Sequence, residues 1–248
     1  MQQITLSIAQ WQFIQKILEH KPRQRKHSLQ EVMQGIFYLV KTGCQWRMLP
    51  SCYPKWQLVY YYFSLWRDNG LIDELLHHLR EKVRKRMGKK ASPTVGIMDS
   101  QSVKSACNRA MKGFDGNKKV NGRKRHIVVD TNGWLMAVLV HSANIHDTKM
   151  APLLLRRLKE SLYGIKVLYA DGGYRGELIE TVKKTLGYVL KIVPKAAQGG
   201  VSPKRWIVER TFAWFGNQRR LSLDYEYLNE TAEAMTQLAA INLLIRKI

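Results

Sequence analysis

The first third of the chain places its hydrophobic residues three and four positions apart, which is the spacing of amphipathic helices. Ser28 and Glu31 have the spacing of a capping box, so a helix is predicted over 28–41. The same periodicity predicts further helices around 11–18, over 55–68 and from residue 71 onward. Residues 1–92 are therefore expected to form an all-α domain.

Beyond Ser92-Pro93 the pattern changes to short β-rich runs that alternate with helical stripes. Strands are predicted over 94–98, 126–130, 134–141, 165–170 and 188–193, and helices over 147–162, over 177–186 and from about residue 203. Three antiparallel strands followed by right-handed crossovers give a mixed sheet with helices on both faces. This α/β order is that of a ribonuclease H-like domain, which is expected to occupy residues 93–248.

The charge of the chain narrows the class of partner. Its 248 residues include 41 Lys and Arg against 19 Asp and Glu, a net charge of +22, while 45% are hydrophobic. The hydrophobic fraction excludes a disordered chain, and the charge favours nucleic acid first and an anionic membrane second. Residues 1–92 and the remainder are both basic, so both domains are expected to contact the same polyanion.

The cysteines and the N-terminus argue against a secreted or membrane-inserted protein. There are three cysteines, with no CxxC pair and one left over, which excludes a disulfide framework and a cysteine zinc site. The first residues lack the order of a signal peptide, and no apolar run approaches the ~18 residues that span a bilayer. We therefore expect a cytoplasmic protein with no membrane partner.

Three acidic residues are candidates for metal-dependent chemistry. Asp99 closes the first predicted strand and Asp171 the fourth, and in this topology the two strands lie parallel and side by side. Glu209 borders the buried stripe of the last predicted helix, from which it could reach the same edge of the sheet. Three such carboxylates would bind Mg²⁺ or Mn²⁺, and two ions would clamp both oxygens of a phosphoryl displacement.

Several segments of the chain resemble those of bacterial insertion-sequence DDE transposases of insertion sequence family five. The motifs of the second half are TVGIMDSQSVKS, DGNKKVNGRKRHIVVDTNG, YADGGYRG and RWIVERTFAWFGNQRRLSLDYE, and those of the helical half are GCQWRMLP and PKWQLVYYYFSLWRDNG. They run in the same order over nearly the whole chain. The resemblance implies that Asp99, Asp171 and Glu209 are the catalytic, metal-binding triad.

The resemblance also implies DNA contacts near the triad. Arg205 matches the arginine of the family's Y-R-E-K signature. The tyrosine position of that signature is Ser202 and the lysine position is Gly216, so the lysine's DNA contact would pass to Arg219 or Arg220.

A basic segment over 104–125 is a second candidate for DNA contact. It holds eight basic residues, a single acid, Asp115, and three glycines that we expect to make it mobile. The basic residues are Lys104, Arg109, Lys112, Lys118, Lys119, Arg123, Lys124 and Arg125. We interpret the segment as a phosphate-contacting arm, with a solvated loop as the alternative.

Three further patterns have competing interpretations. The helices over 28–41 and 56–68 suit a helix-turn-helix-like DNA reader or, equally, an ordinary bundle with an aromatic core. His141, His146 and Asp147 suggest a metal site, but Asp147 fits a helix cap better. Tyr174 could be a recombinase nucleophile, yet no Arg-His constellation surrounds it.

These expectations combine into one hypothesis, a transposase that binds double-stranded DNA. It would bind the terminal inverted repeats of its element, cut there with about two Mg²⁺ ions, and join the freed 3′-OH ends to target DNA. Bringing two ends together suggests a homodimer on DNA in the bacterial cytoplasm, at the nucleoid. The alternatives are a nuclease of the same fold without strand transfer and an inactive DNA-binding derivative.

Overall fold

The structure, a computed structural model, describes residues 4–19, 24–162, 164–194 and 204–248. The chain divides into two compact units, which are best described one at a time. The helical unit comprises Met1–Lys89, Gly216–Ser222 and Ala234–Ile248, and the sheet unit comprises Lys90–Phe215 and Leu223–Glu233. The chain first passes from the helical unit to the sheet unit between Lys89 and Lys90, close to the boundary predicted at Ser92-Pro93. The C-terminal stretch, expected to belong wholly to the second domain, instead returns twice to the helical unit.

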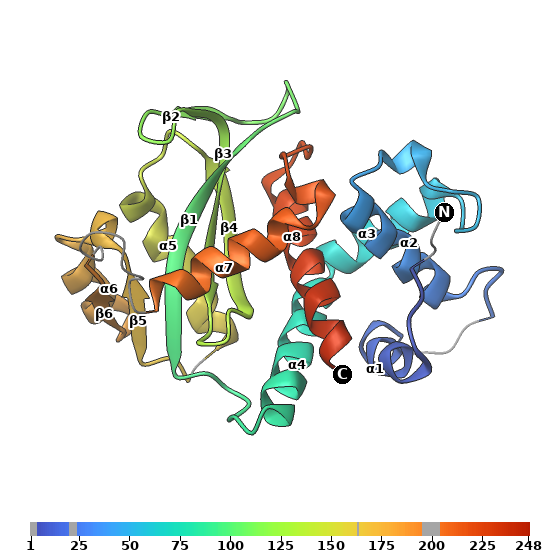
Figure 1. The fold of residues 1–248 in the computed structure, drawn as a ribbon, viewed down its shortest axis with the longest axis horizontal. Helices are drawn as coiled ribbons and strands as arrows, with labels where there is room; N and C mark the ends of the chain where they lie inside the picture. Colours follow the sequence, from blue (N-terminus) through green and yellow to red (C-terminus); the bar gives the residue numbers. More distant parts are fainter. Residues whose placement is uncertain (1–3, 20–23, 163, 195–203) are drawn as a thin grey trace. The chain divides into compact units, whose positions relative to one another are not determined.

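The helical unit is built around one nearly enclosed helix, α2. Its elements (Figure 1) are α1 (Ile8–Leu18), α2 (Leu29–Thr42), η1 (Trp46–Met48), α3 (Trp56–Asp68), α4 (Leu71–Arg86), η3 (Arg219–Leu221), η4 (Ile245–Lys247) and most of α8 (Asn229–Leu244). The capping box predicted at Ser28 and Glu31 begins α2, and Gly43, with a φ of 72°, ends it. Ten of the fourteen residues of α2 are buried, so this helix belongs to the core.

The C-terminal segments are fastened to this helical core by polar contacts. Lys41 donates a hydrogen bond from Nζ to the carbonyl of Asn217 at 2.8 Å, and Arg220 donates to the carbonyl of Cys44 at 3.2 Å. Within the described residues, no helix combines the length and the apolar character needed to cross a membrane.

The sheet unit contains a six-stranded mixed sheet. Its strands are β1 (Val95–Lys104), β2 (Gly113–Asp115), β3 (Val120–Val129), β4 (Leu135–Ser142), β5 (Val167–Ala170) and β6 (Val189–Ile192). β1, β3 and β4 pair antiparallel, whereas β5 pairs parallel with both β1 and β6. The order β4-β3-β1-β5-β6, with the short β2 added on β3, is that of the ribonuclease H-like fold predicted from the sequence.

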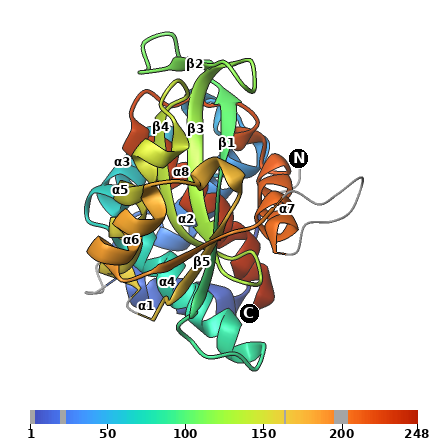
Figure 2. The ribbon, with the colours of Figure 1, turned by 90° about the vertical axis from the view of Figure 1, so that its left-hand side faces the viewer.

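Helices cover both faces of this sheet. They are α5 (Asp147–Ser161), α6 (Leu178–Leu186) and α7 (Arg205–Gly216). Figure 2 shows α5 and α6 on one side and α7 on the other. Met98 and Val128, which are directly opposite each other on β1 and β3, pack into the core beneath α5 and α6. Because side chains alternate along a strand, Asp99 points to the other face, where α7 lies.

The basic segment over 104–125 is more ordered than the sequence suggests. β1 extends through Lys104 and β3 begins at Val120, so much of the predicted arm pairs into the sheet. Gly122 on β3 lies opposite Lys104 on β1, and any Cβ at this position would collide with the carbonyl oxygen of Val103. This glycine therefore serves a close approach of two backbones, rather than mobility.

The buried side chain of Arg123 connects this part of the sheet to other segments of the same unit. Its side chain is 1% exposed and forms an ion pair with Asp224, 3.3 Å away, whose side chain is 3% exposed. The same guanidinium donates to the carbonyls of Met111, Glu226 and Tyr227 at 3.0, 3.1 and 2.6 Å. It thus ties β3 to the segment that leads into α8.

Replacing this arginine should test its structural role. We expect Arg123→Met to lower the free energy of unfolding by about 3–5 kcal/mol, because Asp224 would remain buried without its partner. Denaturant unfolding of the full chain measures the loss. The exposed Lys159→Met should change the value by less than about 0.5 kcal/mol. A loss for Arg123→Met as small as that of the control would contradict the assignment.

Candidate active site

Asp99 and Asp171 are brought together by the register of two parallel strands. β1 pairs with β5 from Val95 to Ile97, and the last pair is Ile97 with Tyr169. Asp99 and Asp171 each lie two positions beyond that pair, so they are neighbours on the edge where β5 has ended. The sequence predicted this meeting but placed the end of β1 at Asp99. β1 in fact continues along β3 to Lys104, and only its β5 side becomes open.

The residues after Asp171 form a short turn that is anchored in the core. The Asp171 carboxylate accepts a hydrogen bond from the amide of Gly173 at 2.8 Å, at the start of η2 (Gly172–Tyr174). Tyr174 is 1% exposed, and its hydroxyl contacts Nε2 of His126 at 2.8 Å. Burial raises the pKa of Tyr174 well above its ordinary value, so this hydroxyl suits an anchor and not the nucleophile of a recombinase.

An open pocket of about 650 Å³ lies over this edge. Its lining combines acidic with basic and polar groups: Asp99, Asp147 and Asp171, with Lys118, Arg175, Arg205, Asn117, His146, Gly172 and Gly173. Burial, together with the neighbouring Asp171, raises the pKa of Asp99 to about 6. The hydrogen bond from the Ser100 amide acts in the opposite direction and lowers this pKa. Two adjacent carboxylates, one of them desolvated, form an electrostatically unfavourable pair that a cation would relieve.

Glu209 is joined to this pair through an arginine. On α7, the Arg205 guanidinium lies 3.7 Å from the Asp171 carboxylate and 3.4 Å from that of Glu209. The Glu209 side chain is 54% exposed. Among the described residues, no three His, Cys, Asp or Glu side chains are grouped closely enough to hold a metal ion. The three carboxylates of the predicted triad therefore do not form one cluster here. Arg205 lies between Glu209 and Asp171.

The donor chemistry of the pair nevertheless suits a divalent cation. Asp99 and Asp171 offer hard carboxylate oxygens at one open edge, which are the ligands that Mg²⁺ and Mn²⁺ prefer. The desolvation of Asp99 is the observation that supports this fit, because a bound cation would favour its ionised form.

The predicted DNA-contacting residues fall into two groups. Lys104, Arg109, Lys118, Lys119 and Arg219 are exposed, and Lys112 and Arg205 are half-buried. Arg123, Lys124, Arg125 and Arg220 are buried, and each bonds a carbonyl or carboxylate inside its own unit. The buried four are already engaged in holding the fold, so only the first group remains available for DNA. Ser202 lies outside the described residues.

Two residues that line the pocket, Asp147 and Arg175, were not chosen as site residues from the sequence. His146 accepts the hydrogen bond that caps α5, from the Thr148 amide at 3.3 Å, so the cap predicted for Asp147 belongs to His146. Asp147, the first helical residue, instead lines the pocket, as does Arg175. The adjacency of Arg175 to the Asp171 turn was a usable signal, whereas nothing local distinguishes Asp147 from a cap.

Comparisons with known proteins match both parts of the chain. Residues 90–243 match the family described as "Transposase DDE domain", and residues 6–76 match "Putative transposase of IS4/5 family". A curated relative from Burkholderia cepacia, "Putative transposase for insertion sequence element IS402", is 35% identical over 114 residues, covering 42% of this chain and 54% of the relative. The chain thus spans about half the length of that relative.

Solved structures of low identity also match. The catalytic core domain of BIV integrase is 18% identical over 53% of this chain and 80% of its own, with a TM-score of 0.32. The Drosophila P element transposase strand transfer complex is 12% identical over 76% and 45%, with a TM-score of 0.34. The Mos1 mariner paired end complex with Mn is 12% identical over 95% and 83%, with a TM-score of 0.35.

The two family matches together cover most of the chain, and the first spans the whole pocket described above. This chain therefore belongs to the transposases that carry a DDE domain.

Proposed function

We propose that this protein cuts DNA at the terminal inverted repeats of an insertion sequence and joins the freed 3′-OH ends to target DNA. The observation that carries the proposal is the pair formed by Asp99 and Asp171. Strand register places both carboxylates at one open edge, in a pocket that is also lined by basic side chains. Carboxylates for metal ions and cations for phosphate are the two requirements of phosphoryl transfer on DNA.

In this proposal, Asp99, Asp171 and Glu209 hold the divalent ions, with Mg²⁺ as the first choice and Mn²⁺ as the second. When bound, two such ions would neutralise the developing charge and lower the pKa of the attacking water or 3′-OH. Glu209 is exposed, and among the described residues its ion pair is with Arg205, so moving its carboxylate from Arg205 to a metal ion would cost little. Arg205, released from the carboxylates, would then face the DNA phosphate.

The DNA would be held by the exposed basic residues of the sheet unit and by the helical unit. Since α2 is nearly enclosed, α3 is the better candidate for DNA contact within the helical unit. Its Tyr60 and Tyr61 are 39% and 58% exposed, and Tyr60 packs against Trp46 of η1 with ring centroids 5.0 Å apart. The next η1 residue, Arg47, is exposed and its guanidinium lies 5.6 Å from the centre of the Trp56 ring. We further infer a homodimer on DNA, because a transposition event must bring two ends together.

The triad is tested by a substitution that removes one charge and little volume. Asp99→Asn should slow Mg²⁺-dependent cleavage of a duplex carrying the inverted repeat by more than about 100-fold, since even an outer-shell partner of a metal ligand accounts for 10–100-fold. DNA affinity, measured by fluorescence anisotropy, should persist. The exposed Glu160→Gln is the matched control. Cleavage by Asp99→Asn at the wild-type rate would remove the catalytic role.

Strand transfer separates this proposal from a plain nuclease of the same fold. A labelled end duplex with a free 3′-OH, incubated with the protein, Mg²⁺ and target DNA, should give products longer than the donor on a denaturing gel. The inverted repeat is read from the DNA that flanks the gene. Cleavage with no longer product would favour the nuclease, and binding with neither reaction would favour an inactive DNA-binding derivative.

The exposed basic residues are tested by the salt dependence of binding. Lys104→Ala, Arg109→Ala and Lys119→Ala should each weaken affinity for any sequence and reduce the slope of log K against log salt by about 0.9, one phosphate contact each. Lys159→Ala, exposed on α5, should leave the slope unchanged. A loss confined to one DNA sequence would instead indicate base reading.

A further inference from the structure

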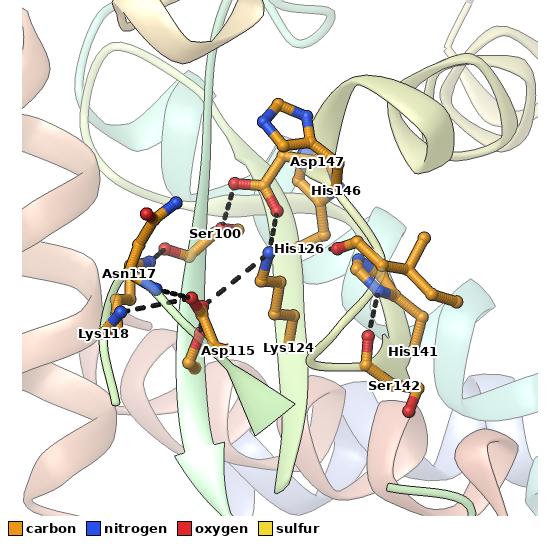
Figure 3. Close-up of polar contacts among 12 residues, drawn as sticks. Ser100, Asp115, Asn117, Lys118, Lys124, His126, His141, Ser142, His146 and Asp147 are labelled. Atoms are coloured by element: carbon orange, nitrogen blue, oxygen red, sulfur yellow. Dashed lines mark hydrogen bonds and ion pairs between the residues drawn. The ribbon is translucent and has the colours of Figure 1, made fainter. Parts of the chain in front are cut away.

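A closed ring of polar contacts lies beneath the pocket, in the region that Figure 3 enlarges. It joins β1, the β2–β3 hairpin, β3 and the first turn of α5. Its members are Ser100, Asp115, Lys118, Lys124 and Asp147. Two of them, Lys118 and Asp147, also line the pocket, so the ring connects the interior of the sheet unit to the proposed reaction site.

Asp115 organises the hairpin turn that reaches the pocket. Its buried carboxylate accepts hydrogen bonds from the amides of Asn117 and Lys118 at 3.0 and 3.1 Å. The Ser102 hydroxyl donates to its other oxygen at 2.5 Å. One buried side chain of β2 thus fixes the two backbone groups at the tip of the turn.

Lys124 links this turn to α5. Its side chain is 8% exposed, and its ammonium lies 3.7 Å from the Asp115 carboxylate and 2.9 Å from that of Asp147. It also donates to the carbonyl of Ile145 at 3.0 Å. Lys124 is directly opposite Ser102 on β1, which puts both side chains on the same face of the sheet.

Ser100 and Lys118 close the ring beside Asp99. The Ser100 hydroxyl donates to the Asp147 carboxylate at 2.7 Å, and its carbonyl accepts a hydrogen bond from Nζ of Lys118 at 2.9 Å. Both contacts are made by the residue that follows Asp99. The Lys118 ammonium therefore stands next to the carboxylate pair, and its charge opposes the rise in the pKa of Asp99 that burial causes.

The ring keeps both of its carboxylates ionised. Burial acts to raise the pKa of Asp147, but the hydrogen bonds from Ser100 and Lys124 outweigh it, and the pKa lies below its ordinary value. Burial likewise acts to raise the pKa of Asp115, and its hydrogen bonds again lower the pKa overall. Buried ion pairs of this kind add little stability over apolar packing, so the geometry that they fix is the more important effect of this ring.

We propose that this ring is a positioning device for the reaction. Asp115 and Lys124 hold the β2–β3 turn so that the Lys118 ammonium stands over the pocket, where it binds the DNA phosphate that reacts. The inference rests on the proposed function, since it concerns the same pocket. Lys118 is the group that contacts the substrate, and Asp115 and Lys124 act through it.

A double-mutant cycle on the full chain tests whether Asp115 acts through Lys118. Single-turnover cleavage of the end duplex with Mg²⁺ should be slower on the order of 100-fold in Lys118→Met, which loses a charged phosphate contact. Asp115→Ala should be slower by about 10- to 100-fold, through misplacement of that contact. The double variant should match Lys118→Met within about twofold. Lys184→Met, exposed on α6, is the matched control for loss of one lysine.

Hydrogen exchange separates a positioning role from a general loss of stability. The amides of Asn117 and Lys118 should exchange faster in Asp115→Ala. Asp115→Asn keeps an acceptor oxygen and should restore both amide protection and most of the cleavage rate. Fast amide exchange with wild-type cleavage in Asp115→Ala would overturn the proposal, as would single effects that multiply in the double variant.

A modified substrate identifies the phosphate. In the absence of metal, the wild-type protein should bind a natural end duplex about tenfold more tightly than one with a neutral methylphosphonate at the cleaved position. Lys118→Met should bind the two duplexes equally. An unchanged preference in Lys118→Met would overturn the inference alone. Wild-type protein that binds end DNA but never cuts it would overturn the proposed function, and the inference with it.

Discussion

The placement of charged side chains at the open edge of the sheet follows from the repulsion between two carboxylates that strand register makes neighbours. Asp99 and Asp171 each lie two positions beyond the last pair of two parallel strands, and burial desolvates Asp99. Two negative charges in that setting require positive charge nearby. Arg205 approaches from α7 and Lys118 from the β2–β3 turn, so cations reach the pair from separate elements of the unit.

The alternation of side chains along β1 places the proposed reaction site on one face of the sheet and its supporting contacts on the other. Asp99 points toward α7, which carries Arg205 and Glu209, whereas Ser100 points toward α5 and contacts Asp147. One strand therefore presents the proposed chemistry on one side and its support on the other. A shift of register by one residue would exchange the two, and the many paired positions between β1 and β3 oppose such a shift.

Local patterns in the sequence were sufficient to predict the architecture of the sheet unit and the proximity of Asp99 and Asp171. Helix periodicity, the capping box at Ser28 and the alternation of strands with helices each report short-range preferences that the fold respects. The buried basic residues were not predictable in this way. Arg123 and Lys124 read as surface charges because their partners, Asp224 and Asp147, are distant in sequence and become neighbours only after the sheet has formed. The position of Glu209 beyond Arg205 likewise depends on side-chain packing.

The last helix has a consequence for how the protein can be divided. α8 begins in the sheet unit and ends in the helical unit, where Leu238, Ile241 and Leu244 are fully buried. A fragment that stopped near residue 92 would lack these side chains and expose the apolar surface that they cover. Residues 1–92 therefore do not contain a complete core, whereas a fragment from residue 93 onward would keep the core of the sheet unit but carry the second half of α8 without the helices of its unit.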